Sequence, residues 1–269
     1  MPPRMSDQIY ETLVLEYPAT HVLQITLNRP KVANAFNTQM ATDLMHCFET
    51  LALEPGDNRC VILTGTGDKA FCAGGDLKQR DGMTNEAWTE QHLIYERMIR
   101  AIIDCPLPLI AAVNGAAFGG GCELAAAVDF VYASENARFA MTETSLGIIP
   151  GAGGTQTLAR ALGERRAKEL ILSARRFNAE EAQRWGLVNE VFTAGILLDE
   201  TIQAASRIAA NAPIAVRQAK QAIHGGLQMS LAEGLVFEIE AYNRTVPTDD
   251  RREGVKAFNE KRPPQFKGK

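Results

Sequence analysis

The sequence predicts an α/β core followed by an all-helical C-terminal region. Through the first two thirds of the chain, short β-rich apolar runs alternate with segments whose apolar residues recur at helical spacing. After about Gly195 the strand pattern ends and only helical patterns follow. We therefore predict an α/β core over residues 1–195, containing any active site, and a helical region over residues 196–269.

The N-terminal part of the core opens with a predicted hairpin and a capped helix. Two β-rich runs, residues 10–17 and 20–28, are separated by a Pro-Ala pair, which favours a hairpin between them. Residues 37–56 begin with the capping residue Asn37, carry apolar residues at helical spacing and end in a Pro-Gly pair. This segment is therefore expected to be a helix.

The middle of the core predicts parallel strands joined by helices. Residues 59–65 and 106–115 are apolar strand candidates on either side of a long amphipathic helix at 84–105. A strand, a helix and a second strand in that order indicate a right-handed crossover. Further short strands are expected at residues 129–134, 137–141 and 186–192.

The C-terminal region contains four helical patterns separated by proline and glycine. They occupy residues 197–213, 214–226, 230–246 and 248–261. We find no fixed-period repeat and no low-complexity linker along the chain. An α/β core with a helical extension is therefore the simplest interpretation.

Composition excludes several classes of protein. The 269 residues carry a formal net charge of −4, which disfavours a broad nucleic-acid-binding surface. No signal-peptide pattern and no apolar stretch long enough to cross a bilayer is found, so we expect a cytoplasmic protein without a membrane segment. The cysteines are scattered and never form a C-x-x-C pair, so we expect reduced, partly buried thiols and no metal site. They are Cys47, Cys60, Cys72, Cys105 and Cys122.

Three consecutive glycines, Gly119 to Gly121, stand between a predicted strand and an alanine-rich helix. The segment matches neither a phosphate-binding loop, nor a serine nucleophile elbow, nor the dinucleotide fingerprint. Backbone N–H groups at the start of a helix favour an anion or oxyanion, and glycine lets a ligand approach the backbone. The alternative is close packing of the helix on the strand.

Two glutamates accompany such glycine-rich segments. Glu123 follows Gly120 by about one helical turn among apolar neighbours, where a carboxylate is costly unless it is paired or used. The alternative is a glutamate that stabilises the helix dipole. Residues 71–79 could supply a second backbone donor, or form a plain turn closed by Asp76. Glu143 precedes a third glycine-rich stretch and could equally be a solvated loop carboxylate.

Together these motifs resemble the enoyl-CoA hydratase/isomerase (crotonase) family. The segments are "LIAAVNGAAFGGGCELAAAVD", "AFCAGGDLK" and "SLGIIPGAGGTQTLAR", and the similarity runs from "LNRPKVANAFN" to the C-terminus. The resemblance implies a spiral of repeated ββα units and a helical C-terminal region used in trimerisation. It also implies a homotrimer or a homohexamer built from two trimers.

The resemblance also implies a role for each matching residue. Gly75 and Gly120 would donate the two oxyanion N–H groups, and Gly75 stands where alanine is common in the family. Glu123 and Glu143 would be the catalytic acid and base. Coenzyme A would be bound by Lys31, Ala33, Ala73, Asp76 and Leu77, and by Phe258 and Lys261 of a neighbouring subunit. The acyl pocket would include Leu146, Pro150 and Gly151.

The function expected from this resemblance is hydration of a 2-enoyl-CoA thioester to a 3-hydroxyacyl-CoA, as in fatty acid β-oxidation. No metal or separate cofactor is implied, because coenzyme A is part of the substrate. Alternatives within the family are an isomerase, a branched-chain or methylglutaconyl-CoA hydratase, and an acyl-CoA hydrolase. An RNA-binding or interaction protein is the alternative of another class, disfavoured by the acidic balance. The histidines are assigned surface or packing roles. They are His21, His46, His92 and His224.

Overall fold

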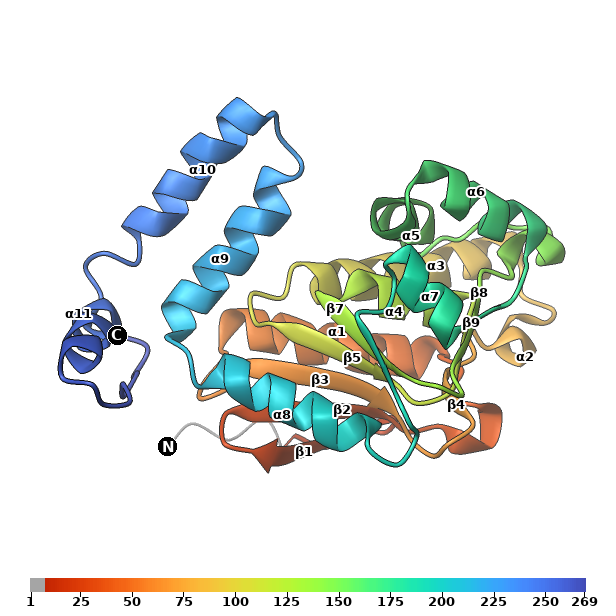
Figure 1. Cartoon of the computed structure of the whole chain (residues 1–269). Coiled ribbons are helices and arrows are strands. Elements are labelled where there is room, and N and C mark those ends of the chain that lie inside the picture. The colour runs from red at the N-terminus through yellow and green to blue at the C-terminus, as the bar shows by residue number, and fades with distance from the viewer. Residues whose placement is uncertain (1–7) are drawn as a thin grey trace.

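Two β-sheets build the core of the chain in the computed structural model, which describes residues 8–269 (Figure 1). The larger sheet contains β1 (Leu13–Ala19), β2 (Val22–Leu27), β3 (Cys60–Gly65), β5 (Leu109–Val113), β7 (Phe130–Ser134) and β10 (Glu190–Phe192), in that spatial order. The smaller sheet contains β4 (Ala70–Cys72), β6 (Ala116–Phe118), β8 (Arg138–Ala140) and β9 (Phe177–Asn178). Because β2, β3, β5 and β7 pair in parallel, the crossover connections between parallel strands are confirmed, while their right-handedness stays a prediction.

The described residues also form helices, most of them in the second half of the chain. They are α1 (Thr38–Leu53), α2 (Leu77–Arg80), α3 (Asn85–Ile103), α4 (Gly120–Ala127), α5 (Gly154–Leu162), α6 (Glu164–Ser173), α7 (Ala179–Trp185), α8 (Leu197–Ala209), α9 (Pro213–Gly226), α10 (Leu231–Asn243) and α11 (Asp249–Asn259). Two 3₁₀ turns are η2 (Pro30–Val32) and η3 (Glu143–Leu146).

The two sheets arise from a repeated ββα unit. A strand of the larger sheet is followed by a strand of the smaller sheet and then by a helix, in β3–β4–α2, β5–β6–α4 and β7–β8–α5. Each unit therefore advances both sheets by one strand, which produces a spiral. The spiral fold class is confirmed, although the second strand of each unit has only three residues.

The N-terminal elements follow the predicted pattern closely. The hairpin is confirmed, but its turn lies at His21, which has a φ of 64°, and Pro18 lies inside β1. Asn37 caps α1 by accepting a hydrogen bond from the Met40 amide. The four C-terminal helices also occur as expected.

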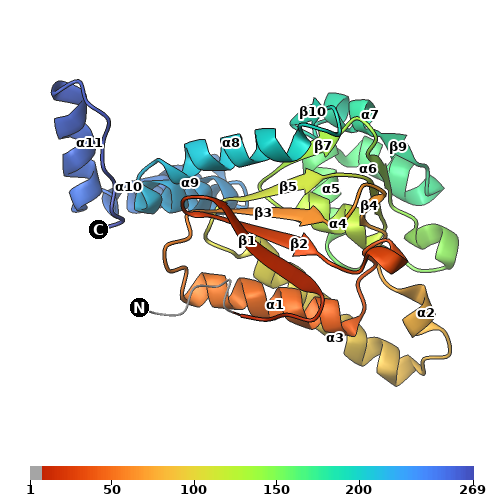
Figure 2. The same ribbon diagram turned by 90° about the horizontal axis from the view of Figure 1, so that it is seen from below.

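Period-two alternation lets the larger sheet bury both faces. In β3, Val61 and Leu63 pack in the same core as α1 and α3, whereas Cys60 and Ile62 pack in a second core with α8. Figure 2 shows α1 and α3 on one side of the sheet and α8 on the other. The larger sheet thus lies between two apolar cores, one shared with α1 and α3 and the other with α8.

Helices α9 to α11, with the residues that follow them, form an arm (residues 213–269) that projects from the core in Figure 1. Within α9 and α10 the buried residues are Pro213 and Ala241. The arm instead exposes large apolar side chains: Ile223, Leu227, Leu231, Leu235, Val236, Ile239, Tyr242, Val255 and Phe258. A subunit interface on this face is the arrangement that the family resemblance implies.

All five cysteine side chains lie in the interior, at 1% exposure or less. Burial raises the pKa of Cys47, Cys60 and Cys72 to about 12. They are therefore more deeply buried than the sequence suggests. Within the described residues, no helix is both long and apolar enough to cross a membrane.

Candidate active site

A cavity of about 600 Å³ opens beyond the C-terminal ends of β4, β6 and β8, the parallel strands of the smaller sheet, and α3 forms its other side. Its wall combines residues of both glycine-rich loops with both candidate glutamates. Those residues are Gly74, Gly75, Gly119, Gly120, Glu123 and Glu143. Residues from segments nearly 70 positions apart in the sequence therefore line the same cavity.

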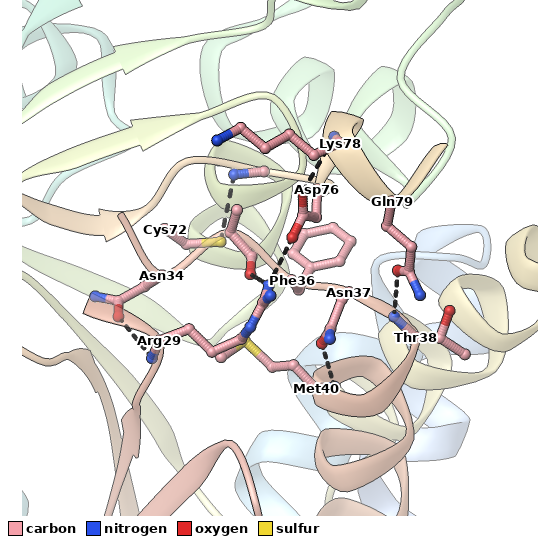
Figure 3. Close-up of polar contacts among 12 residues, drawn as sticks. Arg29, Asn34, Phe36, Asn37, Thr38, Met40, Cys72, Asp76, Lys78 and Gln79 are labelled. Atoms are coloured by element: carbon pink, nitrogen blue, oxygen red, sulfur yellow. Dashed lines mark hydrogen bonds and ion pairs between the residues drawn. The ribbon is translucent and has the colours of Figure 1, made fainter. Parts of the chain in front are cut away.

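The first glycine-rich loop is fixed to the chain entering α1. The Phe36 amide donates to the Gly74 carbonyl at 2.9 Å, and the Asp76 amide donates to the Phe36 carbonyl at 2.9 Å. The Asp76 side chain accepts from the Lys78 amide at 3.1 Å and pairs with Arg29 at 3.0 Å (Figure 3). These contacts hold Gly75 between two anchored residues.

The second loop lies directly against the first. A Cβ built on Gly74 would be 3.1 Å from the Gly120 nitrogen, so the two loops touch through backbone atoms. A Cβ on Gly121 would lie 1.9 Å from the Cys72 carbonyl oxygen. Close helix–strand packing therefore accounts for Gly121, while Gly120 faces the cavity.

Backbone N–H groups of both loops remain without a partner. Across residues 8–269, neither the Gly75 nor the Gly120 amide donates a hydrogen bond to protein. Both glycines line the cavity. Unpaired backbone donors beside a cavity are suited to an oxygen that carries negative charge.

Glu123 lies in the first turn of α4 and is 3% exposed. Its Oε1 accepts hydrogen bonds from the Ala152 and Gly154 amides, each at 2.8 Å. Burial raises the pKa of this carboxyl to about 7, and the neighbouring Glu143 also raises it. The two amide donors oppose this shift and hold the carboxyl in one orientation.

Glu143 is the first residue of η3 and is 7% exposed. Its Oε2 is buried without a protein partner among the described residues, while its Oε1 would lie 3.0 Å from a Cβ on Gly119. Burial raises the pKa of this carboxyl as well. Because Gly119 has a φ of 51°, glycine serves both the turn and the space that Glu143 occupies.

The residues expected to contact coenzyme A are distributed in two places. Ala73 and Leu77 line the cavity, and the Ala73 amide donates to the Ala33 carbonyl, which brings the segment containing Lys31 alongside. The side chain of Asp76 is occupied by its helix cap and ion pair. Phe258 and Lys261 belong to the arm and do not line the cavity of their own chain.

The residues expected in the acyl pocket mostly meet at the cavity. Leu146 and Gly151 line it, whereas the buried Pro150 between them does not. Around them stand further apolar side chains that the sequence did not single out. They are Phe36, Trp88, Leu93, Ile148 and Ile149.

Sequence reasoning also missed the polar part of the pocket. Arg80, His92 and Glu96 line the cavity from α2 and α3. The His92 ring would lie 2.4 Å from a Cβ on Gly151, so this histidine packs on a glycine at the cavity wall. The spacing of residues 88, 92 and 96 along a helix was a usable signal, because it places them on one face. Among the described residues, no cluster of His, Cys, Asp or Glu could hold a metal ion.

Comparison with known proteins identifies the family of the chain. The family model "Enoyl-CoA hydratase/isomerase" matches residues 18–269. A short-chain-enoyl-CoA hydratase of Clostridium acetobutylicum is 40% identical, covering 90% of this chain and 92% of its own. A 2,3-dehydroadipyl-CoA hydratase of Escherichia coli is also 40% identical, covering 92% and 96%.

A solved structure of an enoyl-CoA hydratase from Bacillus anthracis superposes with a TM-score of 0.94 at 46% identity. The match covers 96% of this chain and all of that one. The sequence and structure comparisons thus each extend over nearly the whole chain. The chain belongs to the enoyl-CoA hydratase/isomerase family.

Proposed function

We propose that this protein adds water to a 2-enoyl-CoA thioester and produces a 3-hydroxyacyl-CoA. The observation that carries the proposal is the shared cavity of two buried carboxyls and two unpaired backbone donors. The names of the enoyl-CoA hydratases among its relatives support the same reaction class.

The glycine amides explain how such a reaction is accelerated. Attack of water on an α,β-unsaturated thioester transfers negative charge to the thioester oxygen. The Gly75 and Gly120 N–H groups would bind that oxygen more strongly as its charge develops. Because both donors are backbone groups in packed loops, their positions are fixed before the substrate arrives.

The glutamates supply the proton transfers. One carboxylate orients and deprotonates the water while the other carboxyl delivers a proton to Cα. The Glu123 Oε1 is held by two amides, which leaves its Oε2 for the water. Glu143 has a buried Oε2 without a protein partner, as a group that meets water or substrate requires. Two neighbouring buried carboxyls favour a state with one proton between them.

An isomerase is the second candidate within the family. Moving a double bond requires one carboxylate that removes a proton and returns it, whereas this cavity contains two. The pair therefore favours hydration. Neither reaction uses a separate cofactor, since proton transfer and the substrate's own thioester are sufficient.

Solvent oxygen distinguishes the two reactions. Incubating a 2-enoyl-CoA with the protein in oxygen-18 water should give a 3-hydroxyacyl-CoA labelled at C3, measured by mass spectrometry. Rapid conversion of a 3-enoyl-CoA to the 2-enoyl isomer, with no labelled alcohol from any 2-enoyl substrate, would identify an isomerase instead.

The arm suggests how the subunits assemble. We propose a trimer, alone or paired as a hexamer, in which the exposed apolar face of α9 and α10 is covered by other copies. Phe258 and Lys261 would then contact the coenzyme A bound by a neighbour. The mass of the particle in solution, measured by light scattering, tests this arrangement.

A further inference from the structure

Arg80 is an unexpected charge in the wall of the cavity. It ends α2 and lies half-buried, with its guanidinium carbon 4.1 Å from the centre of the Trp88 ring and 5.0 Å from that of Tyr95. Its Nε donates to the Gln91 Oε1 at 2.8 Å. Two aromatic rings and one amide therefore hold the guanidinium in place.

This charge has no counter-ion in the protein. Within residues 8–269, no carboxylate oxygen lies within 4.0 Å of an Arg80 nitrogen, and the nearby Asp76 pairs with Arg29 instead. Glu96 lines the same cavity without forming an ion pair with Arg80. A guanidinium that is held in place but has no carboxylate partner is suited to binding a carboxylate.

The position of Arg80 indicates which part of a substrate would bring that carboxylate. The guanidinium carbon is 4.0 Å from where a Cβ on Gly75 would lie, so it stands beside a proposed oxyanion donor. With the thioester oxygen bound at the Gly75 amide, as proposed above, the acyl group that adjoins the thioester lies next to Arg80.

The other titratable groups that line the cavity are His92, Tyr95, Glu96, Glu123 and Glu143. Arg80 is the single lysine or arginine in its described wall. A substrate carboxylate would be repelled by Glu96 and by the negative charge shared between Glu123 and Glu143, and attracted to Arg80. Charge and position therefore direct the far end of the acyl chain toward this residue.

We propose that Arg80 selects 2-enoyl-CoA thioesters whose short acyl chain ends in a carboxylate. This inference rests on the proposed hydratase function and specifies its substrate class. Arg80 takes no part in proton transfer; it binds and orients the acyl end.

The kinetic test compares two substrates that differ in this carboxylate. We expect wild-type kcat/KM to be higher for glutaconyl-CoA, which has a terminal carboxylate, than for crotonyl-CoA, which lacks it. In Arg80→Met the ratio of the two kcat/KM values should fall about 10- to 100-fold, as for loss of hydrogen bonds to a charged group. Arg80→Lys, which keeps a charge but loses the fork, should give an intermediate ratio.

A matched control is Arg97→Met on α3. Arg97 is 64% exposed and pairs with Glu49 away from the cavity, so its removal should leave the ratio unchanged. Equal losses on both substrates in Arg80→Met would show a packing role and overturn the inference. So would a wild-type preference for crotonyl-CoA.

Binding without turnover keeps this inference separate from the hydratase proposal. Glutaryl-CoA and butyryl-CoA lack the double bond and cannot be hydrated. Calorimetry should show tighter binding of glutaryl-CoA to the wild type and no such preference in Arg80→Met. This preference without hydration of any substrate would support the Arg80 inference and reject the hydratase. Hydration of crotonyl-CoA together with equal binding of glutaryl-CoA and butyryl-CoA would support the hydratase and reject the Arg80 inference.

Discussion

The core and the arm use similar amphipathic helices in opposite ways. Helices α1, α3 and α8 turn their apolar faces onto the larger sheet, and the largest fully buried side chains all belong to the core. In the arm, Leu227 and Leu231 are 79% and 80% exposed. The core therefore buries its apolar surface within a single chain, whereas the arm leaves its apolar surface exposed.

Polar contacts attach the arm to the core. The Lys220 Nζ of α9 lies 2.8 Å from the Asp129 Oδ2 and donates to the Leu107 carbonyl at 2.9 Å. Arg59 of the core donates to the Phe266 carbonyl of the arm and also to the Ala209 carbonyl at the end of α8. The candidate cavity is thus formed by the core, while the arm exposes the apolar surface for which we propose contacts with other copies of the chain.

Replacing either cavity glutamate with glutamine should abolish most of the hydration activity and leave the arm unchanged. Glu123→Gln and Glu143→Gln should each lower kcat on the order of 10²- to 10⁴-fold, because each removes one proton-transfer partner. The rate is measured by the loss of absorbance of the conjugated thioester. Light scattering should show that the mass of the particle in solution is unchanged. Near-normal turnover in either variant would contradict the assignment.

Removing a backbone donor tests the oxyanion proposal. Gly75→Pro deletes the N–H and should lower kcat about 10²- to 10³-fold. Gly75→Ala keeps the N–H, and its Cβ would meet only ordinary contacts at 3.8 and 4.0 Å, so its activity should stay within about threefold of the wild type. Circular dichroism checks the fold of both. Full activity in folded Gly75→Pro would mean that this amide is not a donor.

The buried carboxyl also makes the stability of the core depend on pH. Because the folded-state pKa of Glu123 is raised to about 7, the folded protein binds more protons than the unfolded chain between about pH 4.5 and 7. The carboxyl therefore stabilises most below this window, and its contribution is lost as pH rises through 7. Glu143 shifts in the same direction.

Glu123→Gln removes one source of that dependence. Relative to the wild type it should gain about 1–3 kcal/mol between pH 4.5 and 8, because the amide never has to ionise in the interior. Unfolding in denaturant at several pH values measures the difference. Parallel stability curves for the two proteins would show that Glu123 ionises without penalty.

Charged side chains on the apolar face of the arm should disrupt the proposed subunit assembly and leave the core folded. Leu231→Glu with Leu235→Glu should yield smaller particles by light scattering, with KM for the CoA ester raised about tenfold as the neighbour's contacts are lost. The control is Leu53→Glu on α1, since Leu53 is 83% exposed but belongs to the core. An unchanged particle mass in the double variant would contradict the proposed interface.

Local signals explain which parts of the fold could be predicted. Helix α1 has a capping asparagine and a Pro-Gly end, and α3 has a long apolar stripe, so both were readable. Strands β4 and β6 have three residues each, too few for a period to show. The ββα repeat could not be recognised for the same reason. Helix α5 was not predicted because it begins inside a glycine-rich loop.

The same contrast applies to the site. Glu123 stood out because a carboxylate among alanines is unusual, and Gly75 and Gly120 followed from the family resemblance. The amides of Ala152 and Gly154 that hold Glu123 come from 29 and 31 residues further along the chain, and no local pattern announces them. Arg80 carries no local signal in the sequence, and only the fold places it beside two aromatic rings.

The deeply buried thiols make the protein its own reporter of unfolding. A thiolate, rather than a thiol, attacks an alkylating reagent, and burial both raises the pKa of Cys72 and blocks access to its sulfur. Labelling therefore requires the surrounding structure to open. Cys60 reports on the sheet face under α8, and Cys122 on the helix that holds Glu123. Mass spectrometry of pulse-labelled peptides would thus map how each layer opens, with no added probe.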